Sequence, residues 1–218
     1  MKIIFFSLFP DLILPYFQDS VLKKALDKKI FEIEVVNFRD YAKNKYKKVD
    51  TPLVGGGAGM IIDNEALRYA LSAYRRKYKN AKILFLTPVG KKYNQKDAVR
   101  FSKEETLFLV CGRYEGFDER LIEDFADEVL SIGDFVMTGG ELGALAIADS
   151  VLRNVKGVLG NSESLEGESF GNSLLEAPNF SKMGSVPDVL KSGNHKKIEK
   201  WRKKASYMKT KFHRPDML

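Results

Sequence analysis

Cysteine and histidine are scarce in this sequence, which has one cysteine and two histidines among 218 residues. A single cysteine, Cys111, excludes an internal disulfide and is typical of a reducing compartment, so we expect a cytoplasmic protein. One Cys and two His also cannot supply the ligands of a structural zinc site, and we predict no metal site. No apolar run reaches the roughly 18 residues of a membrane-spanning helix, so we predict no membrane partner.

Proline is infrequent as well, with 7 residues, while 44% of the chain is hydrophobic and 11% is aromatic. This composition excludes a disordered or fibrous chain and can form one large domain, or one domain with a small appendage. The opening MKIIFFSLF has the hydrophobicity of a signal peptide. However, Pro10 and Asp11 interrupt it and no small-residue cleavage site follows, so we interpret it as a first core strand.

Positive charge is distributed unevenly along the chain. The net charge of the whole chain is +7, whereas residues 182–218 alone hold eleven Lys or Arg and three acidic residues, a net +8. The rest of the chain is therefore close to neutral. A compact basic segment on a near-neutral body favours binding of a polyanion, most often a nucleic acid; the alternative is a lysine-rich helix that is merely solvated.

Short apolar runs alternate with amphipathic segments through the first 151 residues. We predict strands at 2–9, 31–38, 82–87, 106–111 and 128–132, and helices at 19–29, 64–78, 95–101, 118–125 and 141–151. This alternation predicts an α/β fold with a mostly parallel sheet covered by helices on both faces. Ligands of such sheets bind beyond the carboxyl ends of the strands.

A polar segment and a basic helix follow the α/β region. Residues 161–173 are rich in Gly, Ser and Glu without periodicity, which indicates a linker or flexible loop. Asn194 is then expected to be the N-cap of a helix. An apolar stripe along that helix predicts packing through its Trp201 side with lysines outward, and comprises Ile198, Trp201, Ala205, Met208 and Phe212.

Glycines gather where the predicted strands end. The motifs CGRYEG at 111–116, IGDFVM at 132–137 and TGGE at 138–141 place three tight turns at one sheet edge, which favours a ligand pocket over purely structural turns. GGGAG at 55–59 lacks the Lys-Ser/Thr of a phosphate-binding P-loop, and its spacing indicates only a tight turn. The lysines at 43–48 before it are either a solvated loop or a second phosphate contact.

The segment 141–153 is apolar on nearly every helical face, which predicts burial in the core or in a subunit interface. Asp149 and Arg153 stand four residues apart within it. By spacing alone, this arrangement favours a simple intrahelical ion pair.

Taken together, these segments resemble the bacterial tRNA (guanine-N1)-methyltransferases of the SPOUT class. The likeness covers the whole chain in order and is most specific between Cys111 and Leu142. The matching stretches are RDYA at 39–42, GGGAGM at 55–60, CGRYEGFDER at 111–120, SIGDFVMTGGEL at 131–142, GVLGN at 157–161, SGNHKKIEKWR at 192–202 and RPDML at 214–218.

The resemblance implies methylation of the guanine at position 37 of tRNA, next to the anticodon, with S-adenosylmethionine as methyl donor. It implies a trefoil knot in an α/β domain at 1–160, a linker or lid at 161–178 and a small basic helical tRNA-binding domain at 179–218. It also implies a homodimer with a shared active site. Carried over by position, the expected cofactor contacts are Leu86, Pro88, Gly112, Tyr114, Glu115, Ile132, Gly133, Asp134, Phe135, Val136, Met137, Gly139 and Gly140.

Two catalytic residues follow from the same resemblance. Arg153 matches the functional arginine of the family, and Glu168 stands where the family has the aspartate of its D-S-F motif. A carboxylate can accept the N1 proton of guanine as general base, and an arginine can stabilise the negative charge that develops toward O6. The expected tRNA contacts are Gly59, His195, Lys196, Lys197 and Lys200.

The sequence departs from the family in two places, at Glu168 and in a short stretch between Pro178 and Val186. Assistance by a divalent cation is left open. Two alternatives also remain at this point: a SPOUT-class methyltransferase for another RNA site, such as a ribose 2′-hydroxyl or another base, and a non-catalytic RNA-binding relative.

Overall fold

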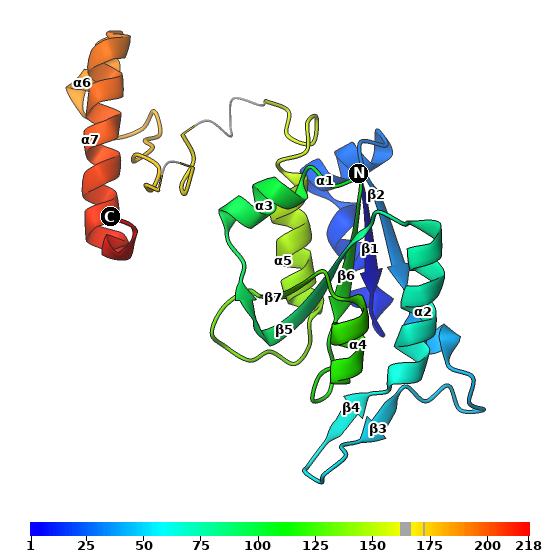
Figure 1. The fold of residues 1–218 in the computed structure, drawn as a ribbon. Helices are drawn as coiled ribbons and strands as arrows, with labels where there is room; N and C mark the ends of the chain where they lie inside the picture. The colour runs from blue at the N-terminus through cyan, green and yellow to red at the C-terminus, as the bar shows by residue number, and fades with distance from the viewer. Residues whose placement is uncertain (162–166, 172) are drawn as a thin grey trace. The chain divides into compact units, whose positions relative to one another are not determined.

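The computed structural model describes residues 1–161, 167–171 and 173–218 (Figure 1). The chain forms two compact units, Met1–Gly160 and Asn161–Leu218, and each is described by itself.

The first unit is built on a five-stranded parallel sheet in the order β2-β1-β6-β5-β7. Its strands are β1 (Lys2–Phe6), β2 (Glu32–Val36), β5 (Lys82–Lys92), β6 (Thr106–Cys111) and β7 (Glu128–Ser131). The five predicted strands and their parallel arrangement are confirmed. The sequence analysis missed a two-stranded antiparallel hairpin, whose strands are β3 (Asp50–Pro52) and β4 (Met60–Ile62).

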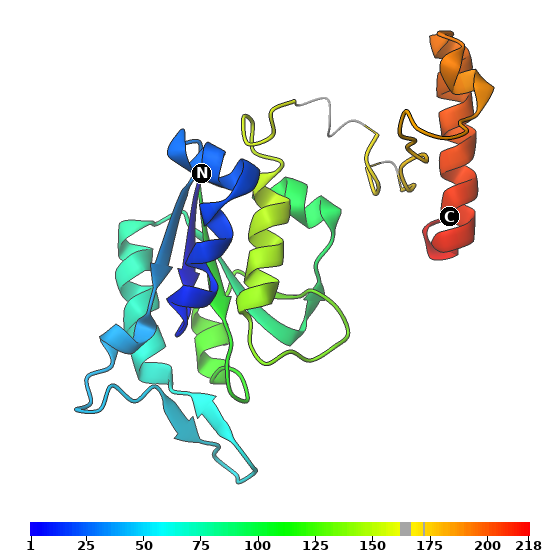
Figure 2. The same ribbon diagram turned by 180° about the vertical axis from the view of Figure 1, so that it is seen from behind.

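Helices cover both faces of this sheet (Figures 1 and 2). They are α1 (Ser20–Asp27), α2 (Asn64–Lys77), α3 (Gln95–Phe101), α4 (Glu119–Phe125) and α5 (Glu141–Leu152), joined by the short 3₁₀ helices η1 (Pro10–Leu12), η2 (Leu14–Gln18) and η3 (Phe38–Tyr41). Four of the α-helices begin after a side chain that accepts a hydrogen bond from the first turn, namely Asp19, Asp63, Asn94 and Asp118. Such caps satisfy backbone N–H groups that the helix itself cannot pair.

The sheet separates two hydrophobic cores because successive strand residues point to opposite faces. On β1, Ile3 and Phe5 pack with α1, α3 and α5, whereas Ile4 and Phe6 pack with α2 and α4. All four side chains are fully buried. This explains why the strands read as continuous apolar runs rather than alternating ones.

Strand β5 continues five residues beyond its predicted end and pairs with β7 again after an irregularity between Leu86 and Lys91. A Cβ at Gly90 would lie 2.5 Å from the backbone nitrogen of Leu130, so only glycine allows the two strands to approach this closely. This irregular part of β5 lies beside the ends of β6 and β7, where the glycine motifs gather.

The second unit contains α6 (Asp188–Lys191), α7 (His195–His213) and η5 (Pro215–Met217). Asn194 is the N-cap of α7, as predicted, and accepts a hydrogen bond from the backbone N–H of Lys197 at 3.1 Å. The predicted apolar stripe is wrong at Met208 and Phe212, whose side chains are 55% and 82% exposed. The physical reason is that an extended segment covers another face of the helix.

That covered face of α7 carries Ser206 and Thr210. Leu175 donates its backbone N–H to Thr210 Oγ1 at 2.8 Å and accepts a hydrogen bond from Ser206. Thr210 is fully buried. The described part of the segment before Pro178 is therefore held on α7 through polar contacts, which a search for apolar periodicity does not detect.

Asp97 links α3 to the edge of the sheet in the first unit. Its carboxylate accepts a hydrogen bond from the backbone N–H of Asn94, completing a capping box, and lies 2.8 Å from both Lys91 Nζ and Arg100 Nη2. Burial alone would raise the pKa of Asp97, but the hydrogen bonds from Lys91 and Arg100 outweigh it and hold the pKa below its usual value.

We predict that Asp97→Asn lowers the free energy of unfolding at pH 7 by about 1–3 kcal/mol, because two cations lose their buried partner. A carboxylate with a depressed folded-state pKa stabilises the fold above about pH 4, and this contribution is lost as the pH falls through the folded-state pKa. Urea unfolding of the variant should therefore depend less on pH between 7 and 3. Asp11→Asn, at an exposed position in η1, is the control. Equal unfolding curves for Asp97→Asn and the wild type would contradict this account.

Candidate functional site

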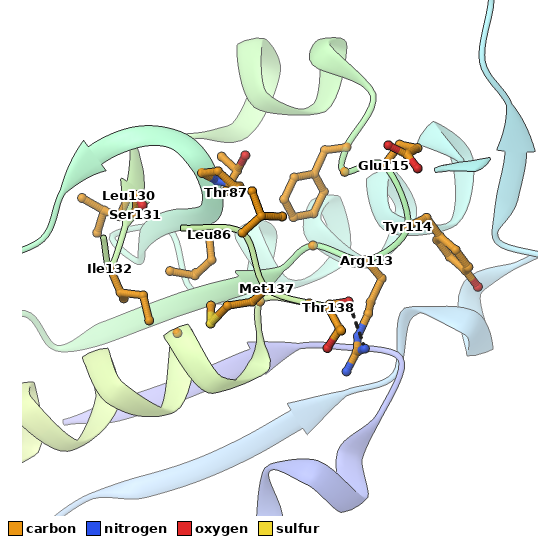
Figure 3. Close-up of a pocket in the computed structure, with 18 of the residues that line it drawn as sticks. Leu86, Thr87, Arg113, Tyr114, Glu115, Leu130, Ser131, Ile132, Met137 and Thr138 are labelled. Atoms are coloured by element: carbon orange, nitrogen blue, oxygen red, sulfur yellow. Dashed lines mark hydrogen bonds between the residues drawn. The ribbon is translucent and has the colours of Figure 1, made fainter. Parts of the chain in front are cut away.

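A cavity of about 190 Å³ lies beyond the carboxyl ends of β5, β6 and β7 (Figure 3). Three loops form its wall: the segment after β6, the segment between β7 and α5, and the turn within β5. The lining residues are Leu86, Thr87, Pro88, Gly112, Arg113, Tyr114, Glu115, Gly116, Phe117, Leu130, Ser131, Ile132, Phe135, Val136, Met137, Thr138, Gly139, Gly140 and Gly143.

Eleven of the thirteen residues that the resemblance marks as cofactor contacts line this cavity. They are Leu86, Pro88, Gly112, Tyr114, Glu115, Ile132, Phe135, Val136, Met137, Gly139 and Gly140. Gly133 and Asp134 lie outside the lining. Gly133 accepts a hydrogen bond from Ser131 Oγ at 2.8 Å, and Asp134 forms an exposed ion pair with Lys92.

Two glycines bring the loops after β6 and before α5 into direct backbone contact. Gly140 donates its N–H to the carbonyl of Gly112 at 2.8 Å. A Cβ at Gly140 would lie 2.8 Å from the nitrogen of Gly112 and 3.0 Å from the Cα of Cys111. Any larger residue at 140 would therefore push the two loops apart and reshape the cavity.

A buried charged pair joins the same two loops. Arg113 Nε lies 3.0 Å from Glu141 Oε2, and the Glu141 side chain is only 2% exposed. These two atoms face each other without hydrogen-bond alignment, so their attraction is electrostatic. Glu141 Oε1 accepts a hydrogen bond from Ser7 Oγ at 2.7 Å, which extends the connection to the end of β1.

Arg113 makes two further contacts that fix its direction. Its Nη1 donates to the carbonyl of Thr138 at 3.1 Å, drawn as the dashed line in Figure 3, and its guanidinium lies 4.5 Å from the ring centroid of Phe9. The sequence analysis singled out neither Arg113 nor Glu141. The available signal was their position inside the glycine motifs CGRYEG and TGGE, but their pairing could not be inferred from it.

Cys111 adjoins this network but is not suited to nucleophilic chemistry. Its thiol is buried, and burial raises its pKa well above the ordinary value, with the Glu141 carboxylate adding to the effect. The thiol therefore remains protonated at neutral pH, whereas the nucleophilic form of cysteine is the thiolate.

Helix α5 is buried over most of its surface, as predicted, but Leu142 is 68% exposed. Arg153 is the C-cap of this helix and donates its backbone N–H to the carbonyl of Asp149 at 3.0 Å. The Asp149 carboxylate accepts a hydrogen bond from the hydroxyl of Tyr16, and this bond raises the pKa of Tyr16 to about 12.

The GGGAG motif forms the tip and return of the β3–β4 hairpin, where Gly55, Gly56, Gly57 and Gly59 have positive φ. A Cβ at Gly59 would lie 2.5 Å from Glu115 Oε1 in the cavity wall. Glu115 donates its N–H to the carbonyl of Met60 at 2.8 Å, so the hairpin is attached to the loop after β6.

Glu168 lies in the second unit, whereas Arg153 lies in the first. Glu168 lines a cleft of about 270 Å³ that also includes Glu176, Arg202, Lys203 and Ser206. The predicted linker continues through residues outside the described part of the chain, among them Glu163 and Glu166. The remaining predicted tRNA contacts, His195, Lys196, Lys197 and Lys200, are all exposed on the first turns of α7.

Within residues 1–161, 167–171 and 173–218, no group of three or more His, Cys, Asp or Glu side chains has an arrangement that could hold a metal ion. Among the helices of this described part, none is long and apolar enough to cross a bilayer.

Comparisons with known proteins agree over the full length of the chain. The family model described as tRNA (Guanine-1)-methyltransferase TrmD matches residues 1–218. A protein of Helicobacter pylori strain J99 named tRNA (guanine-N(1)-)-methyltransferase is 51% identical over 227 residues, covering 100% of this chain and 97% of the relative. Proteins with the same name from Campylobacter jejuni serotype O:6 and Nitratiruptor are 51% and 49% identical, and each match covers 97% of the relative. The chain therefore belongs to the tRNA (guanine-N1)-methyltransferase family.

Proposed function

We propose that this protein methylates N1 of guanine 37 in tRNA and that the cavity at the carboxyl ends of β5, β6 and β7 holds S-adenosylmethionine. The observation that carries the proposal is the convergence of three glycine loops on one cavity in a chain of this family. S-adenosylmethionine supplies an electrophilic methyl group on a sulfonium sulfur. The role of the loops is to hold this donor in line with the attacking nitrogen.

The residues around the cavity fit such a donor. Leu86, Ile132 and Met137 supply apolar surface, while the glycine loops bring backbone N–H and C=O groups to the wall without covering side chains. Glu115 adds a carboxylate that suits hydroxyl groups or a positive charge. We assign these groups to the donor, with Arg113 and Glu141 holding the loops in place.

Glu168 and Arg153 are assigned to the guanine. N1 carries a proton at neutral pH and becomes a good nucleophile only when that proton leaves. Glu168 accepts it as general base, and Arg153 stabilises the negative charge that develops toward O6. An arginine paired tightly with the carboxylate would lower its pKa and weaken it as a base, so we propose that the two side chains bracket the guanine instead.

The base and the basic helix belong to one unit, which suggests how tRNA binding and catalysis are coupled. Phe170 donates its N–H to the carbonyl of Leu174 at 2.8 Å, and Glu176 donates its N–H to Ser169 Oγ at 3.0 Å. Leu175 is in turn bound to α7. We propose that α7 grips tRNA phosphates and brings Glu168 to the flipped guanine, with residues 161–178 acting as linker and lid.

We further propose a homodimer and a knotted chain path, as the resemblance implies. Exposed apolar side chains support the dimer: Leu142 on α5 and Phe135 and Val136 beside the cavity are 68%, 55% and 84% exposed. A second copy would cover them and complete a shared site. The hydrogen bond between Gly140 and Gly112, which brings two of the glycine loops into contact, supports the knotted path.

The reaction itself is the first test. Incubation of the protein with labelled S-adenosylmethionine and unmodified tRNA, followed by nuclease digestion, should yield label only in 1-methylguanosine. A tRNA with adenosine at position 37 should accept no label. Label in a ribose-methylated nucleoside would overturn the proposed reaction, and label in the adenosine-37 tRNA would overturn the position.

Glu168→Gln should reduce methyl transfer about 10²- to 10⁴-fold, because the amide cannot accept the N1 proton. The affinity for S-adenosylhomocysteine should stay within twofold of the wild type, since Glu168 lies outside the cavity lining. Glu168→Asp, which restores the residue usual in the family, is the matched control and should retain most of the activity. Single-turnover rates and calorimetry measure the two quantities; a fully active Glu168→Gln protein would remove the base assignment.

Light scattering on the free protein should report about twice 24.7 kDa, because exposed apolar side chains next to the cavity favour association. Leu142→Glu should shift the mass toward the monomer and lower activity with it. A fully active wild-type monomer would contradict the shared site.

A further inference from the structure

The segment 39–48, which begins within η3 and ends two residues before β3, holds the entire excess of positive charge in the first unit. Residues 1–160 contain 25 Lys or Arg and 22 acidic residues, and this loop alone contributes five basic residues against one acid. Without the loop, the remainder of the unit has a net charge of −1. We call residues 39–48 the basic loop.

Hydrogen bonds hold the backbone of the basic loop in a defined shape. Asn44 Nδ2 donates to the carbonyl of Lys48, and Asn44 Oδ1 accepts from the N–H of Lys48, both at 2.7 Å. Arg39 Nη1 donates to the carbonyl of Lys47, and Lys47 Nζ donates to the carbonyl of Asp40, both at 3.1 Å. Arg39 and Lys47 thus fix the loop, which leaves Lys43, Lys45 and Lys48 for other partners.

The lysines of the basic loop have aromatic neighbours rather than acidic ones. Tyr46 is 83% exposed, and Lys45 Nζ lies 5.8 Å from its ring centroid. Lys43 Nζ lies 3.9 Å from the ring centroid of Tyr69 on α2. Within the described part of the chain, no carboxylate lies within 4.0 Å of the ammonium groups of these lysines or of Lys48.

The basic loop lies at the end of the sheet where the cavity opens (Figure 1). It leads directly into β3, and the β3–β4 hairpin is attached to the cavity wall through the hydrogen bond between Glu115 and Met60. Asp63, just after β4, donates its N–H to the carbonyl of Val49 at 2.8 Å. This hydrogen bond fixes the residue that follows the basic loop to the base of the β3–β4 hairpin. The loop and the cavity wall are therefore parts of one connected structure.

We propose that the basic loop is a second tRNA-binding surface, separate from α7, in which Lys45 and Lys48 contact phosphates and Tyr46 stacks on an unpaired base. Unpaired ammonium groups bind the RNA backbone by releasing its counterions. An exposed aromatic ring among cations is the arrangement that single-stranded nucleic acids use for stacking. The β3–β4 hairpin that follows the basic loop is attached to the cavity wall. Contacts between the loop and RNA therefore fix the position of the RNA relative to the methyl donor. The inference rests on tRNA being the substrate.

The test compares two double variants with the same change of charge. Lys45→Gln/Lys48→Gln alters the basic loop, and Lys24→Gln/Lys28→Gln alters exposed lysines in and just after α1, at the other end of the sheet. Fluorescence anisotropy with unmodified full-length tRNA gives the Kd of each between 50 and 200 mM salt. The loop variant should bind about 5- to 20-fold more weakly at low salt, with a log Kd–log salt slope shallower by about 2.

Substitutions of Tyr46 distinguish the contribution of stacking to tRNA binding from the contribution of charge. Tyr46→Ala should weaken tRNA binding without changing the salt slope, and Tyr46→Phe should bind like the wild type, because a phenyl ring still stacks. Binding of S-adenosylhomocysteine should be unchanged in every variant. If the loop variant matches the Lys24→Gln/Lys28→Gln control in Kd and slope, the inference is wrong although the proposed function stands. If the wild-type protein binds no tRNA, both fail.

Discussion

The attraction between Arg113 and Glu141 is the constraint on which the architecture of the cavity depends. The Glu141 side chain is 2% exposed and the Arg113 side chain 20% exposed, so the carboxylate above all would carry a desolvation cost without its partner. Their pairing holds the loop after β6 against the start of α5, and Ser7 adds the end of β1. Removing either partner of such a pair costs about 3–5 kcal/mol, which is enough to disorganise loops held otherwise by a few backbone contacts. The glycines allow the loops to approach, and the charges keep them together.

The proposed catalytic groups are divided between the two units of the chain. The first unit holds the cavity assigned to the methyl donor, while the second carries Glu168 and the exposed lysines of α7. The segment around Glu168 is hydrogen-bonded to α7, so the proposed base belongs to the same unit as the proposed RNA-binding helix. The full-length family match supports guanine-N1 methylation of tRNA over the ribose-directed and non-catalytic alternatives.

Local sequence was sufficient for the five parallel strands and the helices between them, but not for the β3–β4 hairpin or for contacts between distant segments. Continuous apolar runs predicted the five parallel strands because each is buried on both faces. Parallel strands have their carboxyl ends at one edge of the sheet, so the sequence alone places the glycine motifs around one cavity. By contrast, Ser7 and Glu141 are 134 positions apart, and no periodicity connects them. The stripe on α7 failed at Met208 and Phe212 because polar contacts to Ser206 and Thr210, rather than apolar burial, decide which face is covered.

The most direct measurement is calorimetric titration of the folded protein with S-adenosylhomocysteine, the demethylated product of the donor. The wild type should bind it at the cavity with measurable heat. Gly140→Val should lose this binding while keeping its circular dichroism spectrum, since a side chain at 140 collides with the backbone of Gly112. A folded wild-type protein that releases no heat, or a Gly140→Val variant that binds as tightly as the wild type, would contradict the assignment of the cavity.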